Sequence, residues 1–356
     1  MKKPWRTAIV GNLQALNVLL PAFQAVPGFE VTALCGRNEE AVRGAAANAG
    51  VRKVHQAWEP LAEDPDIEVV ALALPPLLQS QAAVKLAAAG KHLFCEKPLA
   101  ADLTGAQAIA EAVTGHQRVA AVNFGFRMIE AFRDFQAIGQ SGILGAPQFG
   151  VVEWLLATRR NPALTWNWKS DARLGGGALN MMTSHVLDYL GWIFGEMLAV
   201  RLQTAALVPA RPETGSGRLK PVQADDSNSL LLTLSPHLPV NVIVSTALSV
   251  ARGHRLRVWF ENGLLELANS PDDDFHDGFK LTFYPAKNTG ASLDQEVRRR
   301  AAFSHMEACF PGRIAASRRV VEEFALALAG AASRMPTLAE ALRVQKWMER
   351  ARLSQA

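Results

Sequence analysis

Lys97 and His185 are the residues whose type and setting could carry acid–base chemistry. Lys97 follows the apolar run His92–Cys95, which is typical of a β-strand, and Pro98 then fixes the direction in which the chain leaves that strand. A cation at the carboxyl edge of a sheet can stabilise a developing alkoxide or assist proton transfer. His185 suits a proton relay because the unperturbed pKa of imidazole lies near neutrality. The structural alternatives are a surface lysine and a buried histidine held by Asp188.

A run of three glycines, Gly175–Gly177, precedes the segment that carries His185. Because glycine has no side chain, the chain can pass close to a substrate or cofactor there. Met181, His185 and Asp188 are spaced i, i+4, i+7, which places them on one face of a helix.

The first candidate nucleotide-binding feature is the turn after the apolar run Thr7–Val10. Glycines are preferred where backbone N–H groups approach a pyrophosphate. Against the pattern G-x-G-x-x-G, this turn keeps Gly11 but has Leu13 and Leu16 at the other two positions. A single glycine after a strand is a weak signal, and an ordinary turn is the simpler interpretation.

The residues that end the second expected strand bear on the choice of nucleotide. They read Cys35-Gly36-Arg37, where an acid would usually bind the adenosine ribose. Arg37 could instead pair with a 2′-phosphate, which favours NADP over NAD. The alternative is a solvated loop arginine.

These residues require a fold that brings strand ends together, and the first third of the chain predicts one. Continuous apolar strands separated by helices indicate a parallel, doubly wound sheet covered on both faces, with ligands at the carboxyl ends of its strands. The expected strands are Thr7–Val10, Glu30–Leu34, Val69–Leu74, His92–Cys95 and Val119–Asn123, and the expected helices are Leu16–Phe23, Glu39–Ala49, Gln81–Ala89 and Leu103–Val113.

The pattern changes after about residue 145, where strands follow one another with few helices between them. This predicts an α+β domain built on a large, mostly antiparallel open sheet, with Asn262–Gly263 as a hairpin signal. Arg211–Asp226 is expected to be a long polar loop, and Ile314–Leu353 to be helical with a new start at Pro336–Thr337. The expected strands are Phe149–Ala157, Ala199–Leu207, Ser229–Leu234, Val240–Ser245 and Arg255–Glu261. We therefore divide the chain into a Rossmann-type domain, 1–124, and a substrate-binding and oligomerisation domain, 125–356, whose last helix could pack back on the first domain.

Composition excludes several classes of protein. The chain is 49% hydrophobic and 20% charged, which is ordinary for a globular protein. The net charge of +4 comes from scattered residues, and the densest run, Arg298–Arg300, reads as a solvated face and not as a nucleic-acid site. Three cysteines without paired spacing (Cys35, Cys95 and Cys309) argue against disulfides and against a metal site. The apolar stretches are too short to span a membrane, so we expect a cytoplasmic protein.

Two segments carry a specific resemblance. Residues 89–99, AGKHLFCEKPL, resemble the A-G-K-H-V-x-x-E-K-P-L signature of the glucose–fructose oxidoreductase/inositol dehydrogenase (Gfo/Idh/MocA) family, and residues 175–188, GGGALNMMTSHVLD, resemble its G-G-G-x-L-x-D-x-G-x-H-x-x-D motif. Weaker matches at Phe126-Arg127, Trp168-Lys169, Ala224–Asp226 and Met335–Thr337 extend the resemblance over nearly the whole chain.

The resemblance implies an NAD(P)-dependent dehydrogenase or reductase that transfers a hydride between nicotinamide and a hydroxyl or carbonyl carbon of a small molecule, such as a sugar or cyclitol. It implies Lys97 and His185 as catalytic residues, and a homodimer or homotetramer formed through the C-terminal sheet. The implied cofactor-binding residues are Gly11, Asn12, Leu13, Gly36, Arg37, Leu74, Pro75, Pro76, Gln79, Glu96 and Lys97. The implied substrate-binding residues are Lys97, Arg127, Trp168, Lys169, Asn180, Met181 and His185.

The sequence also departs from the family. Besides Leu13 and Leu16, Gln79 replaces a usual histidine, Met181 the catalytic aspartate and Thr183 a glycine. A thioether cannot relay a proton, so the site is expected to be more apolar. Two alternatives therefore stay open: a non-redox enzyme that uses bound NAD transiently, and a non-catalytic relative that binds a ligand or partner.

Overall fold

The computed structural model describes residues 3–272, 278–286 and 312–355, and the Arg298–Arg300 run and Cys309 lie outside them. The chain forms two compact units. The first comprises Met1–Gly125, Arg173–Gly175 and Arg313–Lys346, and the second Phe126–Ala172, Gly176–Gly312 and Trp347–Ala356.

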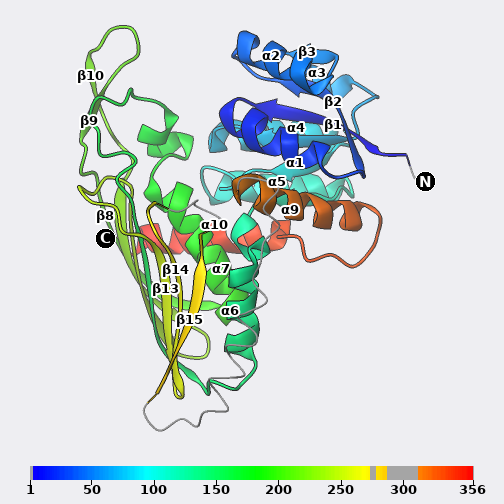
Figure 1. Ribbon diagram of the computed structural model, residues 1–356. Coiled ribbons are helices and arrows are strands. Elements are labelled where there is room, and N and C mark those ends of the chain that lie inside the picture. Colours follow the sequence, from blue (N-terminus) through cyan, green and yellow to red (C-terminus); the bar gives the residue numbers. More distant parts are fainter. Residues whose placement is uncertain (1–2, 273–277, 287–311, 356) are drawn as a thin grey trace. The chain divides into compact units, whose positions relative to one another are not determined.

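The first unit contains a parallel sheet of six strands in the order β3-β2-β1-β4-β5-β6, of which Figure 1 labels β1, β2 and β3. The strands are β1 (Trp5–Gly11), β2 (Phe29–Cys35), β3 (Lys53–His55), β4 (Val69–Ala73), β5 (His92–Cys95) and β6 (Ala120–Val122). β4 reads VVALA, and its first four residues are buried, as expected for a strand covered on both faces. The order reverses direction at β1 and β4, so the carboxyl ends of these strands form the crevice where such sheets bind ligands. The predicted doubly wound sheet is confirmed.

Helices cover both faces of this sheet. They are η1 (Ala15–Leu19, a π-helical turn), α1 (Leu20–Gln24), α2 (Glu39–Ala49), α3 (Pro60–Glu63), α4 (Pro76–Ala88), α5 (Leu103–Gly115) and α9 (Gly312–Leu328). Asn38 and Asp102 cap α2 and α5 by accepting the N–H groups of Ala41 (3.2 Å) and Gly105 (2.8 Å). On one face, Phe324 of α9 stacks on Phe29 of β2, with ring centroids 5.9 Å apart.

The second unit is built on a sheet of seven strands in the order β15-β14-β13-β7-β12-β11-β8. These are β7 (Pro147–Leu155), β8 (Met197–Ala205), β11 (Ser227–Leu234), β12 (Leu238–Ser245), β13 (Gly253–Phe260), β14 (Gly263–Asn269) and β15 (Lys280–Pro285). All neighbours are antiparallel except β12 and β7. The predicted mostly antiparallel open sheet is confirmed, with Asn262 in the turn between β13 and β14.

Burial alternates along these strands because one face packs on helices and the other stays open. In β13, Leu256, Val258 and Phe260 are buried, whereas Arg255 and Trp259 lie on the open face. The helical elements of this unit are η2 (Gly125–Met128), α6 (Glu130–Gln140), η3 (Trp168–Ser170), η4 (Ala172–Leu174), η5 (Leu179–Thr183, a π-helical turn) and α7 (Ser184–Phe194), of which η2 and η4 begin or end in the first unit.

The expectation that Arg211–Asp226 is a loop was wrong in part. This stretch takes part in a two-stranded hairpin of β9 (Ala210–Pro212) and β10 (Leu219–Pro221). The reason lies in Arg211, which is buried and donates to the carbonyl oxygens of Arg159 (2.6 Å) and Asn161 (2.8 Å). Such long-range partners leave no periodic signal in the sequence.

The last helix, α10 (Leu338–Leu353), begins where Pro336–Thr337 predicted a start. Thr337 and Glu340 form a capping box: the N–H of Glu340 donates to Thr337 Oγ1 (3.2 Å) and the N–H of Thr337 to Glu340 Oε2 (2.8 Å). Within the described residues, no helix combines the length and the apolar character that crossing a membrane requires.

Candidate functional site

The turn after β1 brings the backbone close to two neighbouring strands. Gly11 has φ +135°, and a Cβ there would overlap the carbonyl oxygen of Ala73 at the end of β4. A Cβ on Gly36 would lie 2.5 Å from the carbonyl oxygen of Gly11 and 2.7 Å from Asn12 Oδ1. Both positions therefore require glycine, and the backbones at the ends of β1, β2 and β4 approach one another closely there.

The two leucines and Arg37 are placed differently around this turn. Leu13 is 80% exposed, and Leu16, within η1, donates its N–H to Asn12 O (2.8 Å). Arg37 is exposed directly after Gly36. Leu74 and Pro75 are partly exposed after β4, and Pro76 begins α4.

Glu96 is the centre of a hydrogen-bond network after β5. Its Oε1 accepts from Gln14 Nε2 (3.0 Å) and Asn123 Nδ2 (2.8 Å), and its Oε2 accepts the N–H of Lys97 (3.2 Å). Sequence reasoning missed Gln14 and Asn123 as members of this site. Asn123 was detectable, because it ends an expected strand at the carboxyl edge of the sheet.

Gln79 fixes the chain that carries Lys97. Its Nε2 lies within hydrogen-bond distance of the carbonyl oxygens of Glu96 (2.6 Å), Pro98 (3.2 Å) and Leu99 (3.1 Å). Gln79 is 1% exposed, whereas Lys97 keeps part of its side chain in solvent. The replacement of a histidine by Gln79 therefore supplies a clamp for this segment.

The first unit suits a dinucleotide. The strand-to-helix turn around Gly11 and Gly36 has the close backbone approach at which such folds bind a pyrophosphate. Gln79 Oε1 and Asn123 Oδ1 are buried acceptors that receive no hydrogen bond from the described residues. A carboxamide or a ribose hydroxyl could supply the donors that buried acceptors require.

In the second unit, the triple glycine packs against two other segments. A Cβ on Gly176 would lie 2.6 Å from the carbonyl oxygens of both Trp168 and Lys169. The N–H of Gly177 donates to Lys169 O (3.2 Å), and the N–H of Ala178 to Asp225 O (2.9 Å). These contacts bring the candidates Trp168 and Lys169 to the segment that carries Asn180.

Asn180 and Met181 lie in η5, just before α7. Asn180 is 2% exposed, and its Oδ1 accepts from Arg352 Nη2 at 2.6 Å. Met181 is partly exposed, and its N–H donates to Gly177 O (2.9 Å). The i, i+4 spacing would place Met181 and His185 on one face only in a continuous α-helix, whereas here η5 precedes α7. The π-helical turn widens the segment before His185, and such turns are frequent at functional sites.

Asp225 joins this cluster although sequence reasoning gave it no role. Its Oδ2 accepts the N–H of Leu179 (2.9 Å) and Asn228 Nδ2 (2.9 Å). Burial is the main cause that raises the pKa of the Asp225 carboxyl to about 6, with a smaller contribution from Asp226. The Ala224–Asp226 match was a signal that could have drawn attention to it.

His185 lies in an aromatic environment. It is 5% exposed, and its ring meets Phe126 edge-to-face with centroids 4.9 Å apart. Trp154 lies 6.1 Å from His185 and stacks on His254 at 4.2 Å. These rings fix the orientation of His185 by packing.

Arg127 and Asp188 form a buried bidentate ion pair. Arg127 Nε donates to Asp188 Oδ2 at 2.8 Å, and its Nη2 contacts Oδ1. The Arg127 guanidinium also lies 5.9 Å from the ring of Trp192. The pair joins η2 to α7, so Arg127 supports the helix that carries His185, and its direct contact with substrate stays a prediction.

The structure thus describes two groups of candidates. Lys97, Glu96, Gln79, the Gly11 turn and Arg37 belong to the first unit. Trp168, Lys169, Asn180, Met181, His185 and Arg127 belong to the second. Among the described residues, no group of three or more His, Cys, Asp or Glu side chains could hold a metal ion.

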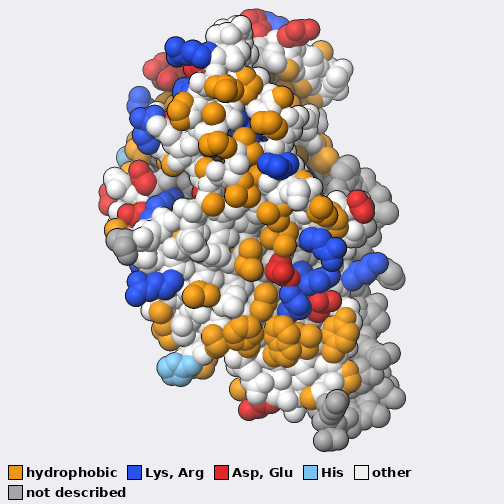
Figure 2. Space-filling model, turned by 90° about the vertical axis from the view of Figure 1, so that its left-hand side faces the viewer, with side chains coloured by type: hydrophobic (Ala, Val, Ile, Leu, Met, Phe, Trp, Pro, Cys, Tyr) orange, Lys and Arg blue, Asp and Glu red, His pale blue; other side chains and the backbone are white. Residues whose placement is uncertain are grey.

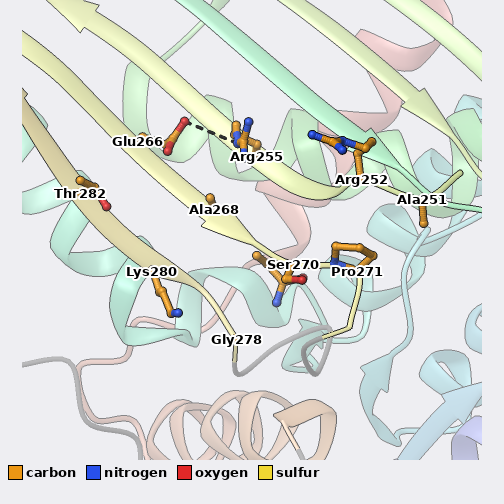
Figure 3. Close-up of a pocket in the computed structure, with 11 residues that line it drawn as sticks. Ala251, Arg252, Arg255, Glu266, Ala268, Ser270, Pro271, Gly278, Lys280 and Thr282 are labelled. Atoms are coloured by element: carbon orange, nitrogen blue, oxygen red, sulfur yellow. Dashed lines mark ion pairs between the residues drawn. The ribbon is translucent and has the colours of Figure 1, made fainter.

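A separate pocket of about 360 Å³ lies at the ends of β13, β14 and β15. Figure 3 shows Arg255 paired with Glu266, with Arg252 and Lys280 nearby. None of the candidate residues above lines it.

Two family profiles match the chain. Residues 5–124 match the oxidoreductase family with an NAD-binding Rossmann fold, and residues 132–266 match the GFO/IDH/MocA C-terminal domain. An uncharacterized oxidoreductase of Synechocystis sp. is 30% identical over 320 residues, which are 89% of this chain and 85% of the relative.

Two relatives have names that include a sugar. Levoglucosan dehydrogenase of Pseudarthrobacter phenanthrenivorans is 30% identical over 202 residues, covering 53% of this chain and 52% of that protein. dTDP-3,4-didehydro-2,6-dideoxy-alpha-D-glucose 3-reductase of Streptomyces violaceoruber is 28% identical over 187 residues, covering 52% of this chain and 53% of that protein.

Solved structures share the fold of both units. A levoglucosan dehydrogenase in complex with NADH and levoglucosan has a TM-score of 0.81 at 21% identity, covering 99% of this chain and 97% of that chain. The WlbA dehydrogenase of Bordetella pertussis, in complex with NADH and UDP-GlcNAcA, has a TM-score of 0.80 at 17% identity, covering 99% of this chain and 96% of that chain. From both profiles and the Synechocystis relative, the chain belongs to the Gfo/Idh/MocA family of NAD-binding oxidoreductases.

Proposed function

We propose that this protein is an NAD(P)-dependent dehydrogenase that transfers a hydride between nicotinamide and a hydroxyl or carbonyl carbon of a sugar, a cyclitol or a related compound. The observation that carries this proposal is the connection between the nucleotide turn and Lys97: Gln14 reaches Glu96, and Glu96 accepts the N–H of Lys97. The two sugar enzymes among the relatives support this substrate class.

Bound NAD(P) would supply or accept the hydride. Lys97 would place its ammonium at the substrate oxygen, where a cation stabilises developing negative charge. Gln79 holds the carbonyl groups around Lys97, so this side chain starts from a fixed backbone. His185 would take or give the hydroxyl proton from a ring held by Phe126.

Arg37 favours NADP(H) as the nucleotide. It is exposed next to Gly36, where a guanidinium can pair with a 2′-phosphate in a bidentate manner. The test is binding of NADPH and NADH to the purified protein by calorimetry, with Arg37→Ala as the variant. Arg43→Ala is the control, because Arg43 is an exposed arginine on α2 that pairs with Glu39. We expect only Arg37→Ala to weaken NADPH binding. Equal or tighter binding of NADH would contradict the assignment to Arg37.

Turnover tests the reaction itself. Wild type, Lys97→Ala and His185→Ala are assayed at 340 nm with sugars, anhydrosugars and cyclitols, including levoglucosan. We expect each variant to lower kcat by about 10²–10⁴-fold while nucleotide binding persists. Nucleotide that copurifies, with product formed but no net absorbance change, would indicate a non-redox reaction. Failure to bind either nucleotide would indicate a non-catalytic relative.

We also propose that the chain assembles into a homodimer or homotetramer through the open face of its second sheet. This face carries ion pairs of Arg255 with Glu266 and of Arg257 with Glu153. It also carries exposed apolar side chains, which include Phe149, Leu231, Ile243 and Tyr284. Figure 2 views this side of the molecule, and its lower part has a band of hydrophobic side chains next to charged ones of both signs.

The proposed compartment is the cytoplasm. Cys35 and Cys95 are buried free thiols, which suits a reducing environment. Burial raises the pKa of both thiols to about 12, so neither is a reactive thiolate at neutral pH.

A further inference from the structure

We propose that Asp225 accepts a hydrogen bond from a hydroxyl group of the substrate and so selects for that hydroxyl. This inference rests on the proposed function, because it assumes a polyhydroxylated ligand in the second unit. It assigns a binding role to a residue outside the candidate set that the sequence predicted.

The main chain places Asp225 among the candidate substrate residues. The N–H of Ala178 donates to Asp225 O (2.9 Å), and the N–H of Gly177 to Lys169 O (3.2 Å). Ser170 O accepts the N–H groups of Gln223 (2.9 Å) and Ala224 (3.3 Å). Three segments, 168–171, 176–180 and 223–225, therefore meet around the triple glycine.

The two oxygens of the Asp225 carboxyl group have different surroundings. Oδ2 is occupied by Leu179 N–H and Asn228 Nδ2, both at 2.9 Å. Oδ1 lies beside Gly177, and the described residues other than Asp225 itself, whose own N–H contacts the carboxyl group, give it no hydrogen bond. Asp225 is partly exposed. A Cβ at position 177 would overlap Oδ1, so Oδ1 stays open because residue 177 is glycine.

The carboxyl group is held rigidly. Asn228, which donates to Oδ2, accepts in turn from Thr183 Oγ1 at 2.9 Å, and both side chains are buried. The Leu179 N–H fixes the same oxygen from the start of η5. A rigid acceptor that a bound ligand covers discriminates between a hydroxyl and the analogue that lacks it, because the acceptor is then left unsatisfied.

Protonation would weaken this contact, because an ionised carboxylate is the stronger acceptor. Burial raises the pKa of Asp225 to about 6, so the weakening of this hydrogen bond occurs at a pH at which binding can be measured. Asp226 on its own segment is the charged group that acts on this pKa. The adjoining segments also carry Lys169, whose carbonyl oxygen accepts the N–H of Gly177, and Arg352, which reaches Asn180 from α10. We expect the Kd for the substrate to rise as the pH falls through about 6.

The test measures ligand binding directly, by calorimetry and ligand-observed NMR, with and without nucleotide. The probes are levoglucosan, myo-inositol and D-glucose, followed by the monodeoxy analogues of whichever binds. The variant is Asp225→Asn. The control is Asp226→Asn, because the Asp226 carboxylate accepts the N–H groups of Leu207 and Val208 (both 2.9 Å) on a different loop. Circular dichroism and urea unfolding establish that both variants are folded.

We expect Asp225→Asn to weaken binding about 10–100-fold and Asp226→Asn less than about threefold. One monodeoxy analogue should bind wild type about 10–100-fold more weakly than the parent compound but bind Asp225→Asn equally well, which a purely structural role would not produce. Equal losses for every analogue in wild type and variant, or no binding of any probe to wild type, would overturn the proposal. Absence of nucleotide binding would overturn only the proposed redox function, since the probes are also tested without nucleotide.

Discussion

At the scale of single residues, the clearest constraint in the second unit is the close approach of Gly177 and Asp225. Gly177 has φ +103°, and a Cβ there would overlap Asp225 Oδ1. Gly195 also has a positive φ, +86°, but nothing lies within 4 Å of the position that its Cβ would occupy. An alanine at either position would therefore be strained by the positive φ, but only an alanine at position 177 would also clash with a neighbouring side chain.

We expect Gly177→Ala to lower the free energy of unfolding by about 1–3 kcal/mol more than Gly195→Ala, since both variants share the strain but only one must displace a carboxylate. Urea unfolding measures both. Equal losses would mean that Asp225 can move aside, and its rigid placement would then be wrong.

The second prediction at this scale concerns the Asp225 carboxyl group and pH. Its pKa is about 6 in the folded protein and 3.8 in the reference state, so the folded state binds the proton more tightly. The resulting stability is present below pH 4 and is lost as the pH rises through 6, by up to about 3 kcal/mol.

Asp225→Asn removes this titration. We expect the stability of the variant relative to wild type to improve by up to about 3 kcal/mol between pH 4 and pH 8, measured by urea unfolding across this range. A difference that is constant with pH would show that the carboxyl pKa is not raised.

How far single residues could be predicted depends on whether their partners are local. The placement of Lys97 after a strand follows from its own neighbours in the sequence, as does the strand-to-helix turn at Gly11. The contacts of Gln14 with Glu96, and of Leu179 with Asp225, join residues 82 and 46 positions apart. Only the folded chain brings such pairs together, so composition and spacing could not reveal them.

At the scale of elements, the bounds of a helix or strand were predicted correctly where its own residues carried the hydrophobic pattern and the residues that start or end it. α2 and β5 have the predicted bounds, and α10 starts where Pro336–Thr337 predicted a helix start. β3 was missed because it has three half-buried residues without a hydrophobic pattern. The π-helical turn η5 was also missed, since helical periodicity does not distinguish a π-turn from an α-turn.

Strand β13 and helix α7 are joined by a buried polar contact that should respond to acid. Tyr189 Oη lies 3.1 Å from His254 Nε2, and burial lowers the pKa of His254 from 6.5 to about 3. Because the folded-state pKa is lower than the unfolded one, the stability from neutral His254 is present above pH 6.5. It is lost as the pH falls from 6.5 toward 3.

We expect wild type to lose about 1.4 kcal/mol of unfolding free energy per pH unit below 6.5 from this residue alone. His254→Phe should show a slope shallower by that amount in urea unfolding between pH 6.5 and 4.5. His237→Gln, which changes an exposed histidine, is measured alongside as the matched control. Parallel slopes for wild type and His254→Phe would mean that His254 is not buried in its neutral form.

At the scale of the whole molecule, each unit carries a different part of the proposed chemistry. The nucleotide features lie in the first unit, and Asp225, Asn180 and His185 lie in the second. Variants should therefore divide into two classes: Arg37→Ala should affect nucleotide binding, and Asp225→Asn should affect polyol binding. A sequence that alternates strands and helices and then runs through strands predicts these two architectures. It contains no information on the number of chains in the assembly.

The assembly leads to the last prediction, which compares two exposed leucines. Leu231 lies on the open face of the second sheet and is 60% exposed, and Leu326 lies on α9 in the first unit and is 44% exposed. If the open face joins two copies through a C2 interface, an arginine at position 231 buries one unpaired charge from each copy in that interface.

We expect Leu231→Arg to shift the protein to monomers at micromolar concentration in sedimentation velocity, while Leu326→Arg keeps the wild-type mass. Each variant should unfold within about 0.5 kcal/mol of a wild-type monomer, because neither leucine is buried within its own chain. Dissociation by Leu326→Arg alone, or a wild-type protein that stays monomeric at 100 times that concentration, would contradict assembly through the second sheet.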